Sequence, residues 1–223
     1  MNDNASAFCT SKYDEEIRKV LPYYEDFYKQ VVDIVKVRFD RPLAWLDIGC
    51  GTGKMAEAAF KDLDIENFLF CDSSEDMIKI AKERFAGENS KYVVSSFPEM
   101  NEPGPFDVIT AMMVFHYFTR ERRKESLQKC YKILHNNGIF ITFENFAPYS
   151  EAGRQLFLER WKFYQLSQGR SAGSCNEHIG RYGKEYFPIP ISEHLELLRQ
   201  CGFEQAEVIW VSNMQVGLLG IKS

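Results

Sequence analysis

Three glycines lie within five positions of the segment Leu46–Gly53, LDIGCGTG, directly after an apolar run. Glycine tolerates positive φ and lets a ligand approach the backbone closely. The residues that follow, Lys54–Lys61, have helical spacing. In an open parallel sheet, ligands bind beyond the carboxyl ends of the strands, where such a loop joins a strand to a helix. This loop therefore predicts a strand–loop–helix unit with a ligand at its turn.

Short apolar runs alternate with helical patterns along the rest of the chain. Strands are expected at Ala44–Ile48, Asn67–Cys71, Tyr92–Ser95, Phe106–Met112 and Gly138–Phe143. Helices are expected at Lys54–Lys61, Glu75–Phe85 and Arg120–Leu134, with Ser73 or Ser74 and Thr119 as N-caps and a turn at Asn136–Gly138. This alternation predicts an α/β fold with a Rossmann-like, doubly wound, mostly parallel sheet.

The end of the chain departs from this alternation. Glu207–Val211 and Val216–Ile221 are β-rich runs that predict an antiparallel hairpin, which brings the sheet to seven strands, and Ser192–Gln200 is helical. Residues 146–190 fit no strand–helix unit, and we expect them to form a helical lid. Residues 1–40 are expected to form an N-terminal helical cover. At 223 residues, the chain 1–223 suits a single domain.

Composition argues against several classes of partner. The net charge of −5 gives no general electrostatic case for binding nucleic acid. The basic run Arg120–Lys124 is expected to be a solvated helix face. The six cysteines show no metal-like spacing, and Cys50, Cys71 and Cys130 fit core positions. Because no signal peptide or membrane-spanning stretch is evident, we expect a soluble cytoplasmic protein without a membrane partner, and the sequence is compatible with a homodimer.

The ligand at the glycine loop is indicated by two acids. Phe68–Asp72 is an apolar run that ends in a carboxylate 19 residues after Gly53, where an acid can accept hydrogen bonds from ribose hydroxyls. A dinucleotide fingerprint requires its third glycine where this chain has Lys54. Asp47, ahead of the loop, suits a cationic group better than a pyrophosphate. The pattern disfavours a nicotinamide dehydrogenase and favours S-adenosylmethionine, which carries an ammonium and a sulfonium.

Four motifs in order resemble those of class I S-adenosylmethionine-dependent methyltransferases of the small-molecule type. LDIGCGTG resembles their first motif and CDSSEDMI, Cys71–Ile78, their second. Phe106–Ile109 with Met113–Tyr117 resembles their fourth-strand motif, and Leu134–Phe140 resembles their turn into the fifth strand. The resemblance covers roughly residues 40–145 and the terminal hairpin, and it implies an enzyme that uses S-adenosylmethionine.

The resemblance also implies a cofactor site. Asp47 would help to hold the methionine ammonium, Asp72 would bind the ribose, and Met77 would border the adenine. The predicted site comprises Asp47, Gly49, Cys50, Gly51, Asp72, Ser73, Met77, Ser96, Phe97 and Met113. One departure concerns Ser96, which stands where the family often has an acid that reads the adenine amino group. We expect Ser96 or a neighbouring backbone group to bond the adenine, with Phe97 packing on it.

The acceptor side is indicated by aromatic residues. The segment Tyr13–Tyr28 resembles the opening of the methyltransferase branch that includes carboxy-S-adenosylmethionine synthase, in which this region closes over the cofactor. Residues 8–28 either form such a mobile cover, with Tyr13 near the active centre, or simply cover the sheet. An aromatic-lined cavity is expected from the insertion residues Trp161, Phe163, Tyr164, Tyr182, Tyr186 and Phe187.

The candidate catalytic residues are His116, Glu144 and Tyr13. His116 follows the fourth strand and is either a base or a buried histidine bordering the cofactor. Glu144 follows the fifth strand, where it could act as a base, bind a cationic substrate or only hydrogen-bond the lid. His178 and Arg181 are expected at the surface, although Arg181 could pair with a substrate carboxylate.

Three functions fit these residues. The first is methyl transfer from S-adenosylmethionine to a small-molecule acceptor. The second is a carboxy-S-adenosylmethionine synthase-like reaction, which consumes prephenate and needs cationic residues beside the methyl group, with Arg181 as the candidate. The third, of another class, is a non-catalytic S-adenosylmethionine-binding scaffold subunit.

Overall fold

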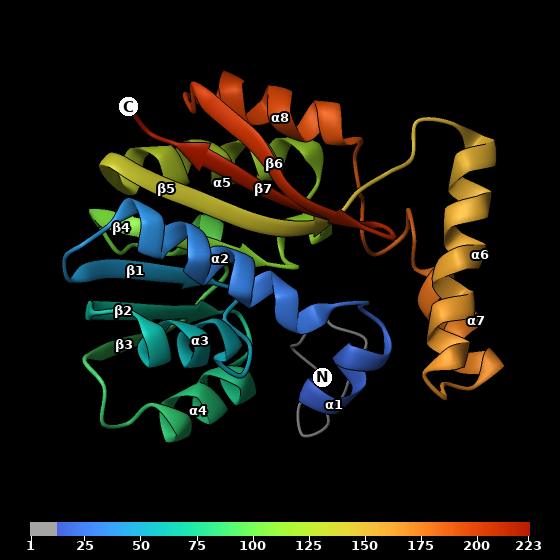
Figure 1. Ribbon diagram of the computed structural model, residues 1–223, viewed down its shortest axis with the longest axis horizontal. Coiled ribbons are helices and arrows are strands. Elements are labelled where there is room, and N and C mark those ends of the chain that lie inside the picture. The colour runs from blue at the N-terminus through green and yellow to red at the C-terminus, as the bar shows by residue number, and fades with distance from the viewer. Residues whose placement is uncertain (1–12) are drawn as a thin grey trace.

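The computed structural model describes residues 13–223, which form a seven-stranded sheet in the order β3-β2-β1-β4-β5-β7-β6 (Figure 1). The strands are β1 (Leu43–Ile48), β2 (Ile65–Asp72), β3 (Ser90–Val94), β4 (Phe106–Met112), β5 (Leu134–Asn145), β6 (Gln205–Ser212) and β7 (Gln215–Ile221). Strands β1 to β5 pair in parallel, while β7 runs antiparallel to both β5 and β6. The predicted α/β fold with a terminal antiparallel hairpin is confirmed.

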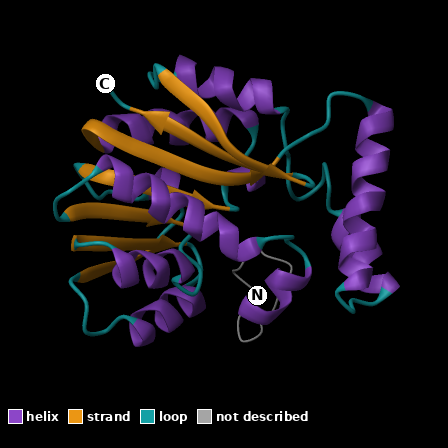
Figure 2. Cartoon of the chain, in the orientation of Figure 1, coloured by secondary structure: helices purple, strands orange, loops and turns teal. Residues whose placement is uncertain are grey.

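Helices cover both faces of this sheet (Figure 2). They are α1 (Tyr13–Glu16), η2 (Ile17–Lys19), α2 (Tyr24–Arg38), α3 (Lys54–Asp62), α4 (Glu75–Arg84), η3 (Phe97–Glu99), η4 (Phe115–Tyr117), α5 (Arg120–Ile133), α6 (Glu151–Ser167), α7 (Ala172–Gly180) and α8 (Ile191–Gln200). Apolar residues of α2, α3 and α4 pack on one face, and those of α5 and α8 pack on the other. Alternation along β1 supplies both cores, because Trp45 faces the first and Leu46 the second.

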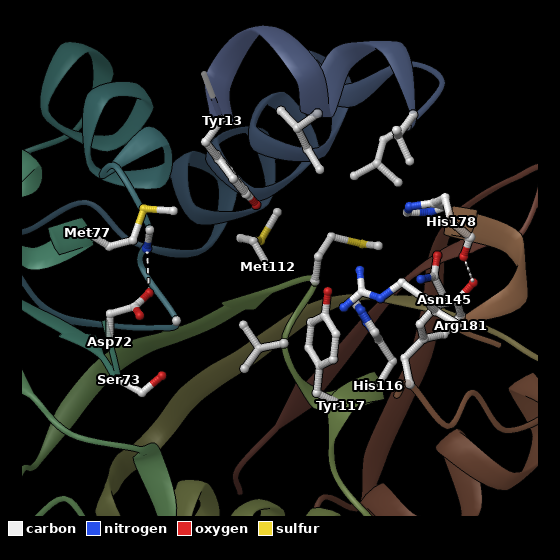
Figure 3. A pocket seen from close by; sticks show the side chains of 18 of the residues that line it. Tyr13, Asp72, Ser73, Met77, Met112, His116, Tyr117, Asn145, His178 and Arg181 are labelled. Carbon is white, nitrogen blue, oxygen red and sulfur yellow. Dashed lines mark hydrogen bonds between the residues drawn. The ribbon is translucent and has the colours of Figure 1, made fainter. Parts of the chain in front are cut away.

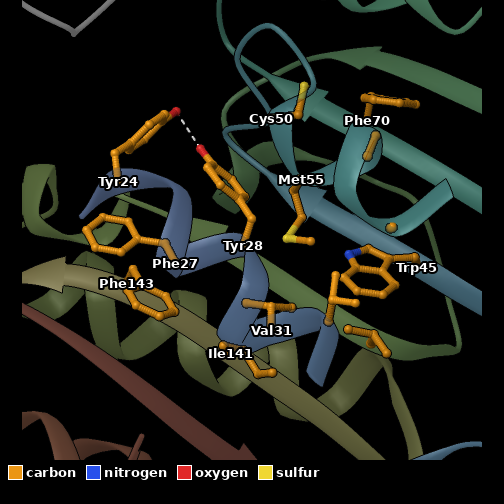
Figure 4. Close-up of a cluster of buried hydrophobic side chains, with 14 of the residues drawn as sticks. Tyr24, Phe27, Tyr28, Val31, Trp45, Cys50, Met55, Phe70, Ile141 and Phe143 are labelled. Atoms are coloured by element: carbon orange, nitrogen blue, oxygen red, sulfur yellow. Dashed lines mark hydrogen bonds between the residues drawn. The ribbon is translucent and has the colours of Figure 1, made fainter. Parts of the chain in front are cut away.

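Aromatic side chains fix α2 to the sheet (Figure 4). Phe27 stacks on Phe143 of β5 with ring centroids 4.6 Å apart. The Tyr28 hydroxyl donates to the Tyr24 hydroxyl, so these two buried phenols satisfy one another. Within the predicted cover, Tyr24 and Tyr28 therefore belong to a helix that covers the sheet, whereas residues 8–12 lie outside the described residues.

Two local predictions are wrong. The helix expected to end at Leu134 ends at Ile133, and β5 begins at once, so the Asn136–Gly138 turn lies inside the strand. Asn137 has φ 64°, and the pairing of β5 with β4 shifts register beside it. The basic run Arg120–Lys124 is also not uniformly solvated, because Arg123 is only 1% exposed. The prediction that Cys50, Cys71 and Cys130 are core residues is confirmed.

The insertion, residues 146–190, contains α6 and α7, which pack on each other beside the sheet (Figure 1). Trp161 of α6 is fully buried and its Nε1 donates to the Val20 carbonyl at 2.7 Å. The Tyr164 hydroxyl donates to the Arg18 carbonyl at 3.1 Å. The insertion is thereby tied to the N-terminal segment (residues 13–21), and both stand at the carboxyl end of the parallel strands.

Candidate active site

A cavity opens where β1, β2 and β4 end (Figure 3). Its walls come from the glycine loop, the end of β2, the loop after β4, the N-terminal segment and the insertion. A smaller adjoining cavity is lined by Asp47, Cys50 and Met113 with tyrosines of α1 and α2. This is the place that the fold provides for a ligand, at the carboxyl edge of the sheet.

Two glycines of the loop have different constraints. Gly49 has φ +62°, and a Cβ there would lie 2.3 Å from Cγ2 of Val114. Gly51 has φ +53°, and no atom lies within 4 Å of the position that a Cβ would take there. Gly51 also lines the cavity. The backbone at Gly51 therefore borders open space in which a side chain would compete with a ligand.

Asp72 ends β2 at the cavity wall. Its Oδ2 accepts from the Gly51 N–H at 2.9 Å, and its Oδ1 accepts from the Ser74 N–H at 2.9 Å. These bonds hold the carboxylate between the glycine loop and the start of α4. Ser73 and Met77 line the cavity beside it, and the Ser74 hydroxyl caps α4 by accepting from the Met77 N–H.

Asp47 is a buried acid on β1. Its Oδ1 accepts from the Thr110 hydroxyl at 2.8 Å, and Thr110 in turn accepts from Nε1 of Trp45 at 2.9 Å. Burial raises the pKa of Asp47 to about 7. An acid held in this way lacks a cationic partner among residues 13–223, so a ligand ammonium would stabilise its charged form.

The opposite side of the cavity is rich in hydrogen-bond donors. Arg181, Asn145 and His178 line it together with His116 and Tyr117 (Figure 3). The Arg181 side chain is 11% exposed, and its Nε donates to Glu185 at 2.7 Å. The Asn145 Oδ1 accepts from Nε2 of Gln215 at 2.9 Å, an arrangement that leaves the amide NH₂ of Asn145 as its donor. Asp72 is the one carboxylate side chain on the wall of this cavity within residues 13–223.

His116 stands in front of a buried carboxylate. Its Nδ1 lies 3.3 Å from Oε2 of Glu144, while Oε1 of Glu144 accepts from the Thr142 hydroxyl at 2.6 Å. Burial lowers the pKa of His116, against the opposing effect of Glu144. Burial raises the pKa of Glu144, but His116, Arg123 and His194 together outweigh this effect and keep that pKa below its usual value. The pair is thus a neutral imidazole on an ionised carboxylate, with Nε2 as the ring nitrogen left for the cavity.

The structure brings most of the predicted site residues together. Gly49, Gly51, Asp72, Ser73, Met77 and Met113 line the main cavity, Asp47 and Cys50 line the smaller one, and Tyr13 and His116 line the main cavity as well. Glu144 does not line either cavity, because it lies behind His116. Ser96 and Phe97 also lie away from both, since the Ser96 hydroxyl accepts from Arg122 and Phe97 is buried under Lys129.

The expectation that His178 and Arg181 lie at the surface is wrong, because both line the cavity and are largely buried. Phe163, expected in an aromatic cavity, is 74% exposed, whereas Trp161 and Tyr186 do line it. Asn145 and Tyr117 were not predicted as site residues. Asn145 ends β5 and Tyr117 follows β4, and this position at the ligand edge of a parallel sheet is the signal that could have found them.

The comparisons with known proteins agree with this geometry. A family model described as a methyltransferase domain matches residues 46–140. The solved plantazolicin methyltransferase BpumL, in complex with a triazolic desmethylPZN analog and SAH, superposes with a TM-score of 0.71 at 16% identity, covering 96% of this chain and 90% of that one. The chain carries a methyltransferase domain and has the fold of class I S-adenosylmethionine-dependent methyltransferases.

The chain is also similar to curated relatives that carry two different names. A carboxy-S-adenosyl-L-methionine synthase of Nautilia profundicola is 24% identical over 202 residues, which are 90% of this chain and 86% of the relative. A malonyl-[acyl-carrier protein] O-methyltransferase of Priestia megaterium is 27% identical over 192 residues, 82% of this chain and 66% of the relative. Within residues 13–223, none of the helices is both long and apolar enough to cross a bilayer.

The residues of this methyltransferase fit S-adenosylmethionine. Gly51 provides an open cradle, Asp72 presents a carboxylate fixed by two backbone N–H groups, and Asp47 is a buried acid whose charge a ligand ammonium would stabilise. Tyr13, in the N-terminal segment, lines both cavities together with Gly49 and Gly51 of the glycine loop. The predicted cofactor is the one that the family uses.

Proposed function

We propose that this methyltransferase transfers a methyl group to a small acceptor that carries a carboxylate. The observation that carries the proposal is the largely buried guanidinium of Arg181. It lies on the donor-rich side of the cavity opposite Asp72, which we call the acceptor wall and which is lined by Arg181, Asn145, His178, His116, Tyr117 and Tyr186. A planar guanidinium pairs with a carboxylate through parallel N–H bonds, and these bonds are strong where water is excluded. Asn145 offers a further neutral donor on the same wall.

The residues of the chain divide the work between binding and proton handling. When bound, S-adenosylmethionine supplies a methyl group already activated by the sulfonium. Asp47, Asp72 and the glycine loop hold the cofactor, and Arg181 orients the acceptor, so positioning provides much of the rate. The Nε2 of neutral His116 accepts a proton where the acceptor must lose one, and Glu144 stabilises the imidazolium that forms.

The test offers the purified protein methyl-labelled S-adenosylmethionine and a set of small carboxylic acids. We expect label in an acid, with S-adenosylhomocysteine as co-product. Arg181→Met should raise the acceptor KM about tenfold or more, because a charge-assisted bond is lost, and should leave cofactor affinity unchanged. Arg160→Met, at an exposed position of α6, is the matched control. If transfer is equally fast in Arg181→Met, the proposal that Arg181 binds a carboxylate of the acceptor is refuted.

A second candidate function is a carboxy-S-adenosylmethionine synthase-like reaction. It is supported by relatives of that name matching 90% of this chain and by Arg181, which suits a carboxylate beside the transferred group equally well. Incubation with prephenate and unlabelled S-adenosylmethionine separates the two functions. Mass spectrometry should detect a carboxylated cofactor for the synthase reaction, whereas methyl transfer should give S-adenosylhomocysteine only when the small carboxylic acids are also present as acceptors.

A further inference from the structure

Arg123 occupies a core position of α5. It lies four residues before Leu127 and seven before Cys130, on the apolar face that packs against the sheet, and it is 1% exposed. Burial of a guanidinium is costly unless its charge and N–H groups are satisfied. Helical periodicity alone would place an apolar side chain here, so the cation must serve contacts that such a side chain cannot make.

Those contacts join two segments that are distant in the sequence. The Nε and Nη2 of Arg123 donate to the Phe115 carbonyl at 3.2 and 2.9 Å, and Nη2 also donates to the Phe187 carbonyl at 3.0 Å. The Phe187 N–H donates to the His116 carbonyl at 2.6 Å. The guanidinium and this backbone hydrogen bond therefore fix the end of the insertion against the loop after β4.

Both segments carry side chains of the acceptor wall. His116 and Tyr117 belong to the loop after β4, and Tyr186 precedes Phe187. The His116 and Tyr186 rings meet edge to face, with centroids 5.9 Å apart. A shift of one segment relative to the other would separate these two rings, so the contacts of Arg123 determine the shape of the wall.

We propose that Arg123 is a positioning residue of the acceptor site, which fixes the end of the insertion to the peptide that carries His116. This role of Arg123 is separate from the transfer reaction itself. It rests on the proposed function only in that His116 faces the acceptor. A lysine has one nitrogen for both carbonyls and lacks the planar fork of arginine, so it would lose the second bond to the Phe115 carbonyl that Nε donates.

The test compares Arg123→Met, Arg123→Lys and the control Arg120→Met, which removes an arginine of the same helix whose side chain is 60% exposed. Hydrogen exchange is measured with S-adenosylhomocysteine bound, and the His116 imidazole resonance is identified by its absence in His116→Gln. In Arg123→Met, exchange over residues 182–190 should accelerate about tenfold or more and the His116 resonance should move, while residues 43–48 stay protected. Arg123→Lys should give a smaller change, and Arg120→Met none.

Neither readout requires turnover, so a failure of the proposed transfer reaction would leave the test intact. Unchanged exchange over residues 182–190 in Arg123→Met would overturn the proposal. Equal acceleration in the β1 residues 43–48 would do the same, because it would make Arg123 an ordinary contributor to the core. If Arg123→Met does not fold, the two readouts on Arg123→Lys decide between these outcomes.

Discussion

The cofactor side and the acceptor side of the cavity are built in different ways. The cofactor side comes from one continuous stretch, from Asp47 to Met77, and relies on backbone N–H groups and two carboxylates. The acceptor side combines side chains from the N-terminal segment, the loops after β4 and β5 and the insertion, with Arg181 as its charged member. The first side presents negative charge to its ligand, whereas the second presents hydrogen-bond donors.

The largest expected effects on the cofactor side come from two substitutions in the glycine loop. Gly49→Ala should destabilise the fold by about 2–4 kcal/mol, because it adds positive-φ strain and drives a methyl group into Val114. Gly51→Ala meets no neighbour and should cost about 1 kcal/mol of stability from its φ, while cofactor affinity falls. Urea unfolding and titration with S-adenosylhomocysteine measure the two effects. Equal stability losses would contradict the different surroundings of these glycines.

The different construction of the cofactor side and the acceptor side explains which features could be predicted from the sequence. Parallel strands and their loops follow from local periodicity, so the seven-stranded sheet, Asp72 at the end of β2 and the Ser74 cap were accessible. Ser96 was harder to place, because its hydroxyl accepts from Arg122, 26 residues away, and its contact with the adenine stays a prediction. Arg181 and His178 were misplaced because their burial depends on α6 and α7 packing beside the sheet, at the carboxyl ends of the parallel strands, and no local pattern encodes that arrangement.

Asp72→Ala tests the cofactor side alone. It should weaken binding of S-adenosylhomocysteine by roughly 2–3 kcal/mol, since charge-assisted bonds to the ribose are lost. Asp76→Ala, at an exposed position of the first turn of α4, is the control. Calorimetry gives both affinities, and an unchanged value in Asp72→Ala would mean that the end of β2 does not contact the ligand.

Acid should unfold the protein through histidines near the acceptor side. Burial lowers the pKa of His178 and His194 to about 3, against 6.5 for an ordinary histidine. The unfolded chain then binds protons below pH 6.5 that the folded chain does not, so stability falls as the pH falls toward 3. At pH 5 each histidine should cost about 2 kcal/mol. Urea midpoints at pH 7 and pH 5 should show a smaller loss for His194→Gln than for the wild type, and an identical loss would contradict this origin.

Asp47 on the cofactor side should titrate in the opposite sense. Its pKa of about 7 lies above the ordinary 3.8, so its folded form holds a proton that the unfolded form has lost, and the stability from this group falls as the pH rises toward 7. A ligand ammonium would lower this pKa, and binding should therefore release a proton. Calorimetry of S-adenosylhomocysteine at pH 6.5, in buffers of different ionisation heat, should detect the release in the wild type but not in Asp47→Asn. Equal proton release in both proteins would mean that the released proton comes from a group other than Asp47.

The smallest expected effect concerns the N-terminal segment, which meets both sides of the cavity. Tyr13, Ile17, Val20 and Leu21 line the main cavity, while α2 behind them packs on the sheet. Because α1 and η2 are short and lie at the cavity wall, we expect their exchange protection to rise when S-adenosylhomocysteine binds, while residues 24–38 stay equally protected in both states.

Tyr13→Phe should then lower turnover a few-fold by removing a hydroxyl at the cavity wall, and Tyr23→Phe, whose ring is 66% exposed, should not. Deletion of residues 1–20 should lower turnover further while the sheet stays folded by circular dichroism. Equal protection of residues 13–21 with and without the ligand would make this segment part of the permanent core. The acceptor side would then be preformed, and the difference between the two sides would lie in their chemistry rather than in their mobility.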